Sequence, residues 1–414
     1  MTDHGIDHLF RHQYGKMVSI LTRIFGLEHL ETVEDAIQDT FIKAMQAWRT
    51  NPPENPEAWL MQASKNRILD LIRKLQAEEK RAPKIASGPA AIALQELFLD
   101  HEIADSQLRM IFTSCHPSLK GGDQIAFALK TISGFSTREI AGALLLKEET
   151  VKKRLSRARK TIVESGMRFE IPYGHKLELR LQMVLRVLYL IFNEGFHSNR
   201  QDMLVREELC GEALRLCRAL MDNPHTKNPD VYALFALFCF QLVRLKSKVA
   251  KGGEIISLEK QDRTLWNRDF MKLGDRAMTK AVETDTYTPY HFEAAIAAEH
   301  IKAKSYEETN WNRIFRWYTM LYEIQPTDFV RLNMAMAQLQ RGENEECKNL
   351  LQSMQPQNLE QRGYLYYGLW AEYHHRKGDK ELCLENMDRA LSMVQNEQER
   401  EYLEKRRKTF CDSL

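Results

Sequence analysis

The chain has 414 residues, of which 43% are hydrophobic and 28% are charged, and its formal net charge is +2. This composition is ordinary for a soluble globular protein and leaves room for two to four domains. The balanced charge excludes a nucleic-acid signal spread over the whole chain, so any such signal must be local.

Targeting and redox signals point to the cytoplasm. Residues 1–13 contain no apolar signal-peptide core, and apolar runs such as 232–240 are too short to span a membrane. Seven scattered cysteines without a CxxC pair indicate reduced thiols. Cys210 and Cys217 share one helix face, where core packing is expected. We therefore predict a cytoplasmic protein without a membrane contact.

Helical periodicity runs through the whole sequence, and glycine and proline are sparse. The pattern predicts an all-α protein made of two small helical domains joined by a flexible linker, followed by a helical C-terminal extension. The predicted blocks are residues 1–80, a linker at 81–104, a second domain at 105–166, a helical region at 167–285 and repeats at 286–414. Pro83, Gly88 and Pro89 mark the linker.

The first block contains an amphipathic helix over 32–48. Ile37, Phe41, Ala44 and Trp48 recur at helical spacing and predict a buried stripe. The polar residues of this helix are expected on the opposite face. After a break at 49–58, the sequence 59–76 predicts a second helix, which is rich in basic residues.

Residues 136–162 predict two short helices joined by a tight turn. Ser136 and Glu139 form a capping-box pattern at the start of the first, which covers 137–145. The second runs from about 148 to 162. Its apolar residues Val151, Leu155, Ala158 and Ile162 predict a buried stripe, from which Lys152, Lys153, Arg157 and Lys160 project away, with Arg154 and Arg159 at the edges.

This pattern is typical of a helix-turn-helix whose second helix enters the DNA major groove. The alternative is an ordinary helical hairpin with a solvated basic face. The capping box, the turn length and the apolar spacing together favour DNA binding.

The last block shows weak internal similarity between residues 333–354 and 368–391. Gly342 and Gly378 are 36 residues apart, close to the tetratricopeptide period of about 34. We predict tetratricopeptide-like repeats, with an irregular helical bundle as the alternative.

The sequence 135–162, "FSTREIAGALLLKEETVKKRLSRARKTI", resembles the promoter-reading helix-turn-helix of extracytoplasmic-function sigma factors. Residues 33–48 resemble the helix of that family that docks on the clamp coiled coil of RNA polymerase. Residues 55–74 resemble its helix that melts the promoter -10 element. The whole chain resembles the subgroup with a long tetratricopeptide-like extension.

The resemblance implies a set of site residues. The -35 element would be read by Lys147, Glu149, Thr150, Lys152, Lys153, Arg154 and Arg157. The -10 element would be held by Trp59, Lys65, Asn66, Arg67, Asp70, Arg73 and Lys74. Core packing is the alternative for Trp59, and an ion pair with a neighbouring Arg or Lys is the alternative for Asp70. Lys147 and Glu149 depart from the residues common in this family, so the promoter sequence cannot be transferred.

Polymerase binding is implied for Glu34, Asp35, Gln38 and Asp39, whose carboxylates suit a basic partner. The alternative is a solvated acidic first turn, where acidic residues are favoured in any helix. The implied partners are core RNA polymerase, through its clamp coiled coil and flap, and promoter DNA in its double-stranded and melted forms. A protein partner for the repeats is a further expectation.

No P-loop, dinucleotide-binding, zinc-protease or hydrolase motif occurs in the sequence. Cys115 and His116 lack a second ligand pair at finger spacing, so a helix end before Pro117 is the better interpretation. We therefore expect no enzyme activity, no cofactor and no metal. The leading hypothesis is a sigma factor with a regulatory or partner-binding extension. The alternative is a conventional helix-turn-helix regulator with a repeat-type sensor.

Overall fold

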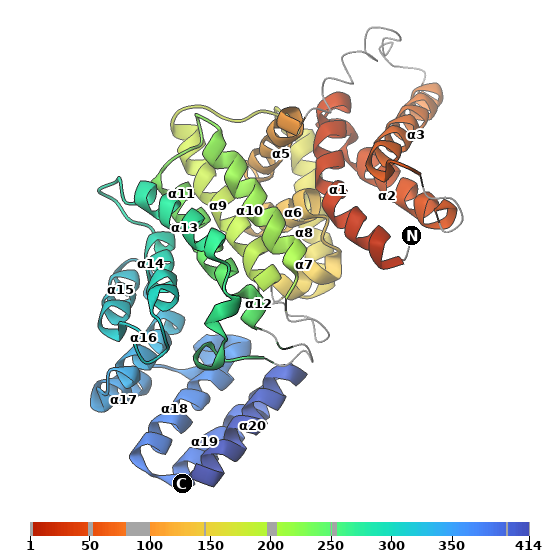
Figure 1. Ribbon diagram of the computed structural model, residues 1–414. Coiled ribbons are helices and arrows are strands. Elements are labelled where there is room, and N and C mark those ends of the chain that lie inside the picture. The colour runs from red at the N-terminus through yellow and green to blue at the C-terminus, as the bar shows by residue number, and fades with distance from the viewer. Residues whose placement is uncertain are drawn as a thin grey trace. The chain divides into compact units, whose positions relative to one another are not determined.

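The computed structural model describes residues 3–48, 53–79, 100–144, 146–196, 205–248, 250, 255–394 and 396–413. The described residues form helices joined by turns (Figure 1), as the periodicity predicted. Two compact units are present, one within 1–198 and 206–226 and the other within 199–205 and 227–414. Each unit is described by itself below.

Within the described residues, the first unit contains ten helical elements, numbered as in Figure 1. They are α1 (Asp3–Phe25), η1 (Leu27–His29), α2 (Leu30–Ala47), α3 (Pro56–Glu79), α5 (Asp100–Ser114), α6 (Gly121–Ser133), α7 (Thr137–Ala143), α8 (Glu148–Glu164), α9 (His175–Phe196) and α10 (Glu207–Asp222). Helix α1 is central, because it packs against α2, α3, α5, α6 and α10. Helices α7 and α8 reach this core through α6.

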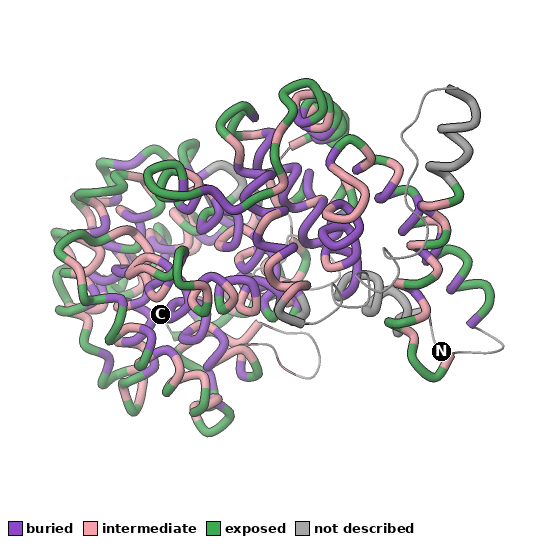
Figure 2. The backbone as a smooth tube through the Cα atoms, turned by 90° about the horizontal axis from the view of Figure 1, so that it is seen from above, coloured by how far each residue is buried: buried purple, intermediate pink, exposed green. Residues whose placement is uncertain are grey.

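The predicted buried stripes are confirmed. Ile37, Phe41, Ala44 and Trp48 are all buried along α2. Val151, Leu155, Ala158 and Ile162 are buried along α8. Figure 2 shows the same alternation of buried and exposed positions along the helices of the chain. Burial of one helical face is the main source of stability for such short helices.

Helices α1 and α6 approach each other very closely at Gly15. A Cβ atom at this position would lie 1.8 Å from the carbonyl oxygen of Ile132. Gly134, which ends α6 in a left-handed conformation with φ of 65°, lies against the ring of Tyr14. Because only glycine leaves this space, residue 15 sets how closely the two helices pack.

The chain after α8 continues within the first unit. Helices α9 and α10 pack on each other, side by side in Figure 1, and both contact α5. Arg215 Nη2 of α10 donates to Oε1 of the buried Gln107 at 2.5 Å. Cys210 and Cys217 are buried in α10, which confirms their expected core role. The compact unit extends to Thr226 and does not end at residue 166. The domain boundary expected at residue 166 stays a prediction from the sequence.

The second unit contains the remaining helices. They are α11 (Pro229–Val243), α12 (Leu245–Lys248), η2 (Leu258–Lys260), η3 (Arg263–Leu265), α13 (Arg268–Ala281), α14 (Pro289–Lys302), α15 (Trp311–Ile324), α16 (Asp328–Gln340), α17 (Asn344–Gln352), η4 (Pro356–Arg362), α18 (Gly363–Lys377), α19 (Lys380–Met393) and α20 (Glu397–Ser413). The segment around η3 is structural: Arg263 Nη1 donates to the carbonyls of His300 and Ala303 at the end of α14, at 2.9 and 2.6 Å.

The two repeat-like segments each form a packed helix pair. Helix α16 packs on α17, and α18 packs on α19. Gly342 and Gly378 occupy the turns of the two pairs, with φ of 81° and 76°. A left-handed turn residue of this kind is a common helix stop. The equivalent turns support the repeat alignment, and the tetratricopeptide likeness itself stays a prediction.

Replacing Gly15 by alanine should destabilise the first unit. The new methyl group would collide with the Ile132 carbonyl, and overpacking of this kind costs roughly 1–3 kcal/mol. Urea unfolding followed by circular dichroism measures this loss.

Gly211→Ala is the matched control, because a Cβ at Gly211 in α10 meets no described atom within 4 Å. That change should stabilise the helix by about 0.5–1 kcal/mol. Equal unfolding midpoints for the two variants would contradict the proposed helix contact.

Candidate nucleic-acid interface

The helix-turn-helix is capped as predicted. Glu139 N donates to Ser136 Oγ at 3.2 Å, and Ser136 N donates to Glu139 Oε2 at 2.9 Å. This confirms the reciprocal capping box at the start of α7. Helix α8 follows at Glu148, with Lys147 as its N-cap residue. The side chains expected to meet DNA therefore lie on the helix that follows the capped helix α7.

The exposed face of α8 begins with polar residues. Lys147, Glu149, Lys152 and Lys153 are exposed, and Thr150 is half-buried. Lys152 Nζ donates to Glu149 Oε1 at 2.9 Å. This contact lowers the pKa of Glu149 and raises the pKa of Lys152. Both groups therefore stay ionised near neutral pH, and the pair must open if either one is to contact a base.

Arg154 and Arg157 are held by the start of α6. Arg154 Nη1 donates to the Gly122 carbonyl at 3.3 Å. Arg157 makes a two-pronged contact with Asp123, with Nε at 3.1 Å and Nη2 at 2.7 Å from its oxygens. The Asp123 carboxylate raises the pKa of Arg157. A phosphate would have to compete with Asp123 for Arg157, whereas Lys153 has no ion-pair partner among the described residues.

The residues expected at the -10 element lie along α3. Trp59 is half-buried and its ring meets that of Trp48 edge-on, with ring centroids 5.3 Å apart. Trp59 therefore packs against the end of α2, as the alternative to a DNA contact predicted. Lys65 is half-buried, and the exposed Asn66 accepts a hydrogen bond from Gln62 at 3.0 Å. Asp70 is exposed.

Arg67 contacts a residue expected to bind polymerase. Its Nη2 lies 2.9 Å from Asp39 Oδ2, and both side chains remain partly exposed. The contact joins α3 to α2, so the two expected surfaces are adjacent. Arg73 and Lys74 fall within α3, but their side chains lie outside the described residues.

The acidic face of α2 requires one correction. Asp35 and Gln38 are exposed and Asp39 is half-buried, as expected for a binding surface. Glu34, however, is only 2% exposed. The error has a geometric cause: residue 34 precedes Ile37 by three and Phe41 by seven positions, which places it on the apolar face of the helix.

Glu34 is instead the centre of a buried polar cluster. Arg159 of α8 donates to Glu34 Oε2 from Nε at 3.1 Å and from Nη2 at 2.6 Å. Tyr14 of α1 donates to Oε1 at 3.2 Å. Burial first and then the Glu34 carboxylate raise the pKa of Tyr14 well above its usual value. The phenol therefore stays protonated and acts as a donor.

A second buried ion pair fixes the helix-turn-helix to the residues that follow it. Arg206, at the start of α10, is 1% exposed, and its Nη2 lies 3.0 Å from Glu139 Oε1. Its Nη1 lies 3.8 Å from Glu194 of α9, and its guanidinium lies over the Phe135 ring at 5.2 Å. Sequence reasoning missed Arg206, because nothing in the local pattern links it to a helix cap about 70 residues earlier.

Comparison with known families agrees with these two parts of the first unit. The model for sigma-70 region 2 matches residues 9–78, and that for sigma-70 region 4 matches residues 109–162. A third family, described as of unknown function (DUF6596), matches residues 180–282. No solved structure matches the chain significantly.

Several curated proteins are similar to the chain. The uncharacterized protein R00370 of Rhizobium meliloti is 33% identical over 97% of this chain and 95% of its own length. The ferric citrate uptake sigma factor FecI of Escherichia coli is 28% identical over 41% of this chain and 92% of its own. The ECF RNA polymerase sigma factor SigE of Mycolicibacterium smegmatis is 26% identical over 38% of this chain and 59% of its own length. The chain belongs to the extracytoplasmic-function sigma factors.

Membership in this family makes the protein a transcription initiation factor and not an enzyme. It carries region 2 in α1–α3, region 4 in α5–α8, and a helical extension matched by the family of unknown function. Cys115 and His116 follow the end of α5 at Ser114, which confirms the expected helix end. Of the described helices, none is long and apolar enough to cross a membrane.

Lys153→Ala should weaken promoter binding and reduce its salt dependence. Each lost phosphate contact lowers the slope of log K against log salt by about one. Fluorescence anisotropy with a promoter duplex at several salt concentrations measures the slope. Lys280→Ala is the control, because this exposed lysine of α13 lies in the second unit. An unchanged slope for Lys153→Ala would remove this residue from the DNA face.

Proposed function

We propose that this sigma factor binds core RNA polymerase through α2, reads the -35 element with α8, and opens the -10 element with α3. The observation that carries the proposal is helix α8, which follows the capped helix α7 and exposes its lysines to solvent in the same compact unit as region 2. A conventional regulator has no need for region 2. Acting with core polymerase, the protein would work in the cytoplasm.

For the -35 element, Lys147, Glu149 and Thr150 at the start of α8 are the candidates for base contacts. Helix N-terminal residues reach base edges when a recognition helix enters the major groove. Lys152 and Lys153 are suited to phosphates, and Arg154 and Arg157 reach DNA only after releasing Gly122 and Asp123.

For polymerase, the candidates are Asp35, Gln38 and Asp39. The pKa of Asp35 is raised by burial and by the charges of Glu31, Glu34 and Asp39. Concentrated negative charge of this kind favours a basic partner, because a cation relieves the repulsion among the carboxylates. The neighbouring exposed Ile42 and Met45 would add apolar contact area.

We propose two roles for the extension. Its first two helices support region 4, since α10 supplies the Arg206 contact to Glu139 and the Arg215 contact to Gln107. Its C-terminal repeats would bind a protein partner and regulate activity. A cavity of about 260 Å³ in the second unit, lined by residues that include Met336, Tyr364 and Tyr402, is large enough for an apolar side chain.

Transcription in vitro tests the main proposal. Purified core polymerase and genomic fragments are incubated with and without the protein, and new 5′ ends are mapped. We expect defined start sites that share upstream sequences. Sequence-specific DNA binding without any initiation would favour the conventional regulator with a repeat-type sensor.

Two truncations test the role of the extension. A chain that ends after Thr226 keeps the whole first unit and should bind core polymerase like the full chain, with altered activity. A chain that ends after residue 166 loses α9 and α10, exposes Gln107 and should unfold at a lower temperature. Pull-down of core polymerase, run-off transcription and thermal melting measure these effects. Identical transcription by the 226-residue and full-length chains would contradict a regulatory role.

A further inference from the structure

Regions 2 and 4 are packed against each other in the first unit. The Glu34–Arg159 pair joins α2 to α8, with Arg159 Nη2 and Glu34 Oε2 at 2.6 Å and the carboxylate almost completely buried. The contact is therefore between the helix expected to bind polymerase and the helix expected to read DNA.

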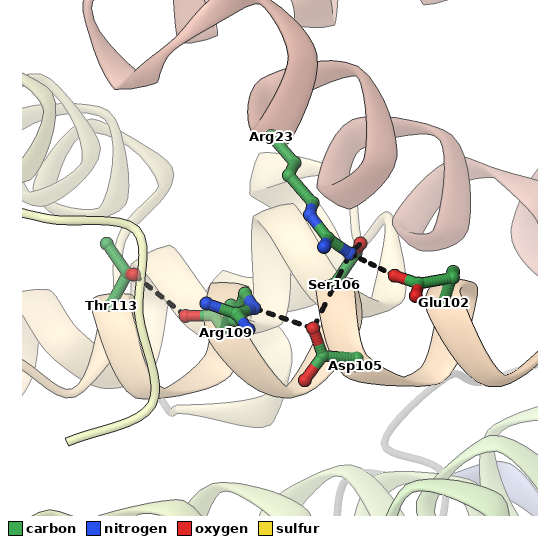
Figure 3. Close-up of polar contacts among 6 residues, drawn as sticks. All are labelled: Arg23, Glu102, Asp105, Ser106, Arg109 and Thr113. Atoms are coloured by element: carbon green, nitrogen blue, oxygen red, sulfur yellow. Dashed lines mark hydrogen bonds and ion pairs between the residues drawn. The ribbon is translucent and has the colours of Figure 1, made fainter. Parts of the chain in front are cut away.

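A second contact reinforces the packing, as Figure 3 shows. Arg23, in the last turn of α1, reaches α5 and donates from Nη1 to Glu102 at 2.6 Å and to Ser106 at 3.2 Å. Asp105 lies 3.5 Å from the same nitrogen and also binds Arg109 at 2.6 Å. Unlike the Glu34 carboxylate, which is only 2% exposed, both the cation and the carboxylates of this second contact are about one-third exposed, so water screens their attraction.

The cluster around Glu34 is charged on several sides. The carboxylates of Glu31, Asp35 and Asp39 share α2 with Glu34, and Lys130 of α6 lies over the Tyr14 ring at 5.6 Å. Burial alone would lower the pKa of Arg159, but the nearby Glu34 carboxylate outweighs it and raises that pKa. Arg159 therefore stays charged, and loss of either partner would leave the other one unpaired at a largely buried position.

We propose that the Glu34 end of α2 is a docking surface that region 4 and core polymerase share. The back of α8 occupies it in the free chain through Arg159, and polymerase binding displaces region 4 from it. The proposal rests on the proposed polymerase contact of α2. It assigns Arg159 to an internal contact, distinct from the basic residues on the exposed face of α8.

The energetics suit an exchange of partners. A buried ion pair contributes little net stability compared with apolar side chains, but removal of one partner strands the other charge and is strongly destabilising. A cation of polymerase that replaces Arg159 would keep Glu34 paired. Region 4 would then be released without a stranded carboxylate, and Arg159 would be hydrated.

Carboxyl footprinting of the full-length chain tests the closed contact directly. A water-soluble carbodiimide and glycine ethyl ester are applied, and peptides are mapped by mass spectrometry. In the wild-type chain we expect Glu34 to resist modification while its exposed neighbour Asp35 reacts. Equal reactivity of the two carboxylates would overturn the proposal, because region 4 would not cover Glu34 in solution.

Arg159→Leu then tests the competition. Loss of the guanidinium strands Glu34, so we expect Glu34 to become reactive and core polymerase to bind about five-fold more tightly or better. A gain in affinity cannot come from unfolding. Arg159→Lys, which keeps the charge, should bind like the wild type, and Arg159→Gln serves if the leucine variant loses helicity. The matched control is Arg218→Leu, which removes an exposed pair within α10.

The outcomes are distinguishable. A reactive Glu34 with unchanged polymerase affinity in both Arg159→Leu and Arg159→Gln would overturn the shared surface and leave the proposed function standing. Absence of polymerase binding by the wild type and by every variant would overturn the proposed function together with this inference. Tighter binding by Arg218→Leu as well would show that the gain is not specific to the contact and would also overturn it.

Discussion

The close approach of α1 and α6 at Gly15 is the constraint on which the first unit depends. Since no Cβ separates residue 15 from the Ile132 carbonyl, the backbones of regions 2 and 4 come almost into contact. Tyr14 is then enclosed in the interface, and the start of α2 lies against α8. The Glu34 carboxylate is consequently buried, and the partly buried Arg159 compensates its charge.

Helix α8 carries two kinds of basic residue with separate roles. Lys152 and Lys153 extend into solvent, where polyanion contacts are available. Arg157 and Arg159 instead neutralise Asp123 and Glu34 of neighbouring helices. Charge counting along the helix does not distinguish these groups, because all are cations on one amphipathic helix. The position of the neighbouring carboxylates determines which of them pair with another helix and which extend into solvent.

The extension is continuous with the sigma regions. The family match at 180–282 begins in α9 of the first unit and ends in the second unit, so it crosses the division between them. Arg206 explains why this arrangement matters, because its ion pair with Glu139 reaches the capping box that begins the helix-turn-helix. Removal of a buried partner of this kind is costly, so α9 and α10 are packed with region 4 in one compact unit.

Local sequence determined the all-α class, the stripe of α2, the capping box and the stripe of α8, because these features depend on residues three to seven positions apart. It also carried the motifs of regions 2 and 4. Tertiary structure alone decided which charged side chains are exposed and which are buried in ion pairs. Glu34 and Arg159 are 125 residues apart and Arg206 lies far from Glu139 in the chain, so no periodic pattern signals their pairing. Burial and pairing of charges depend on the packing of distant helices.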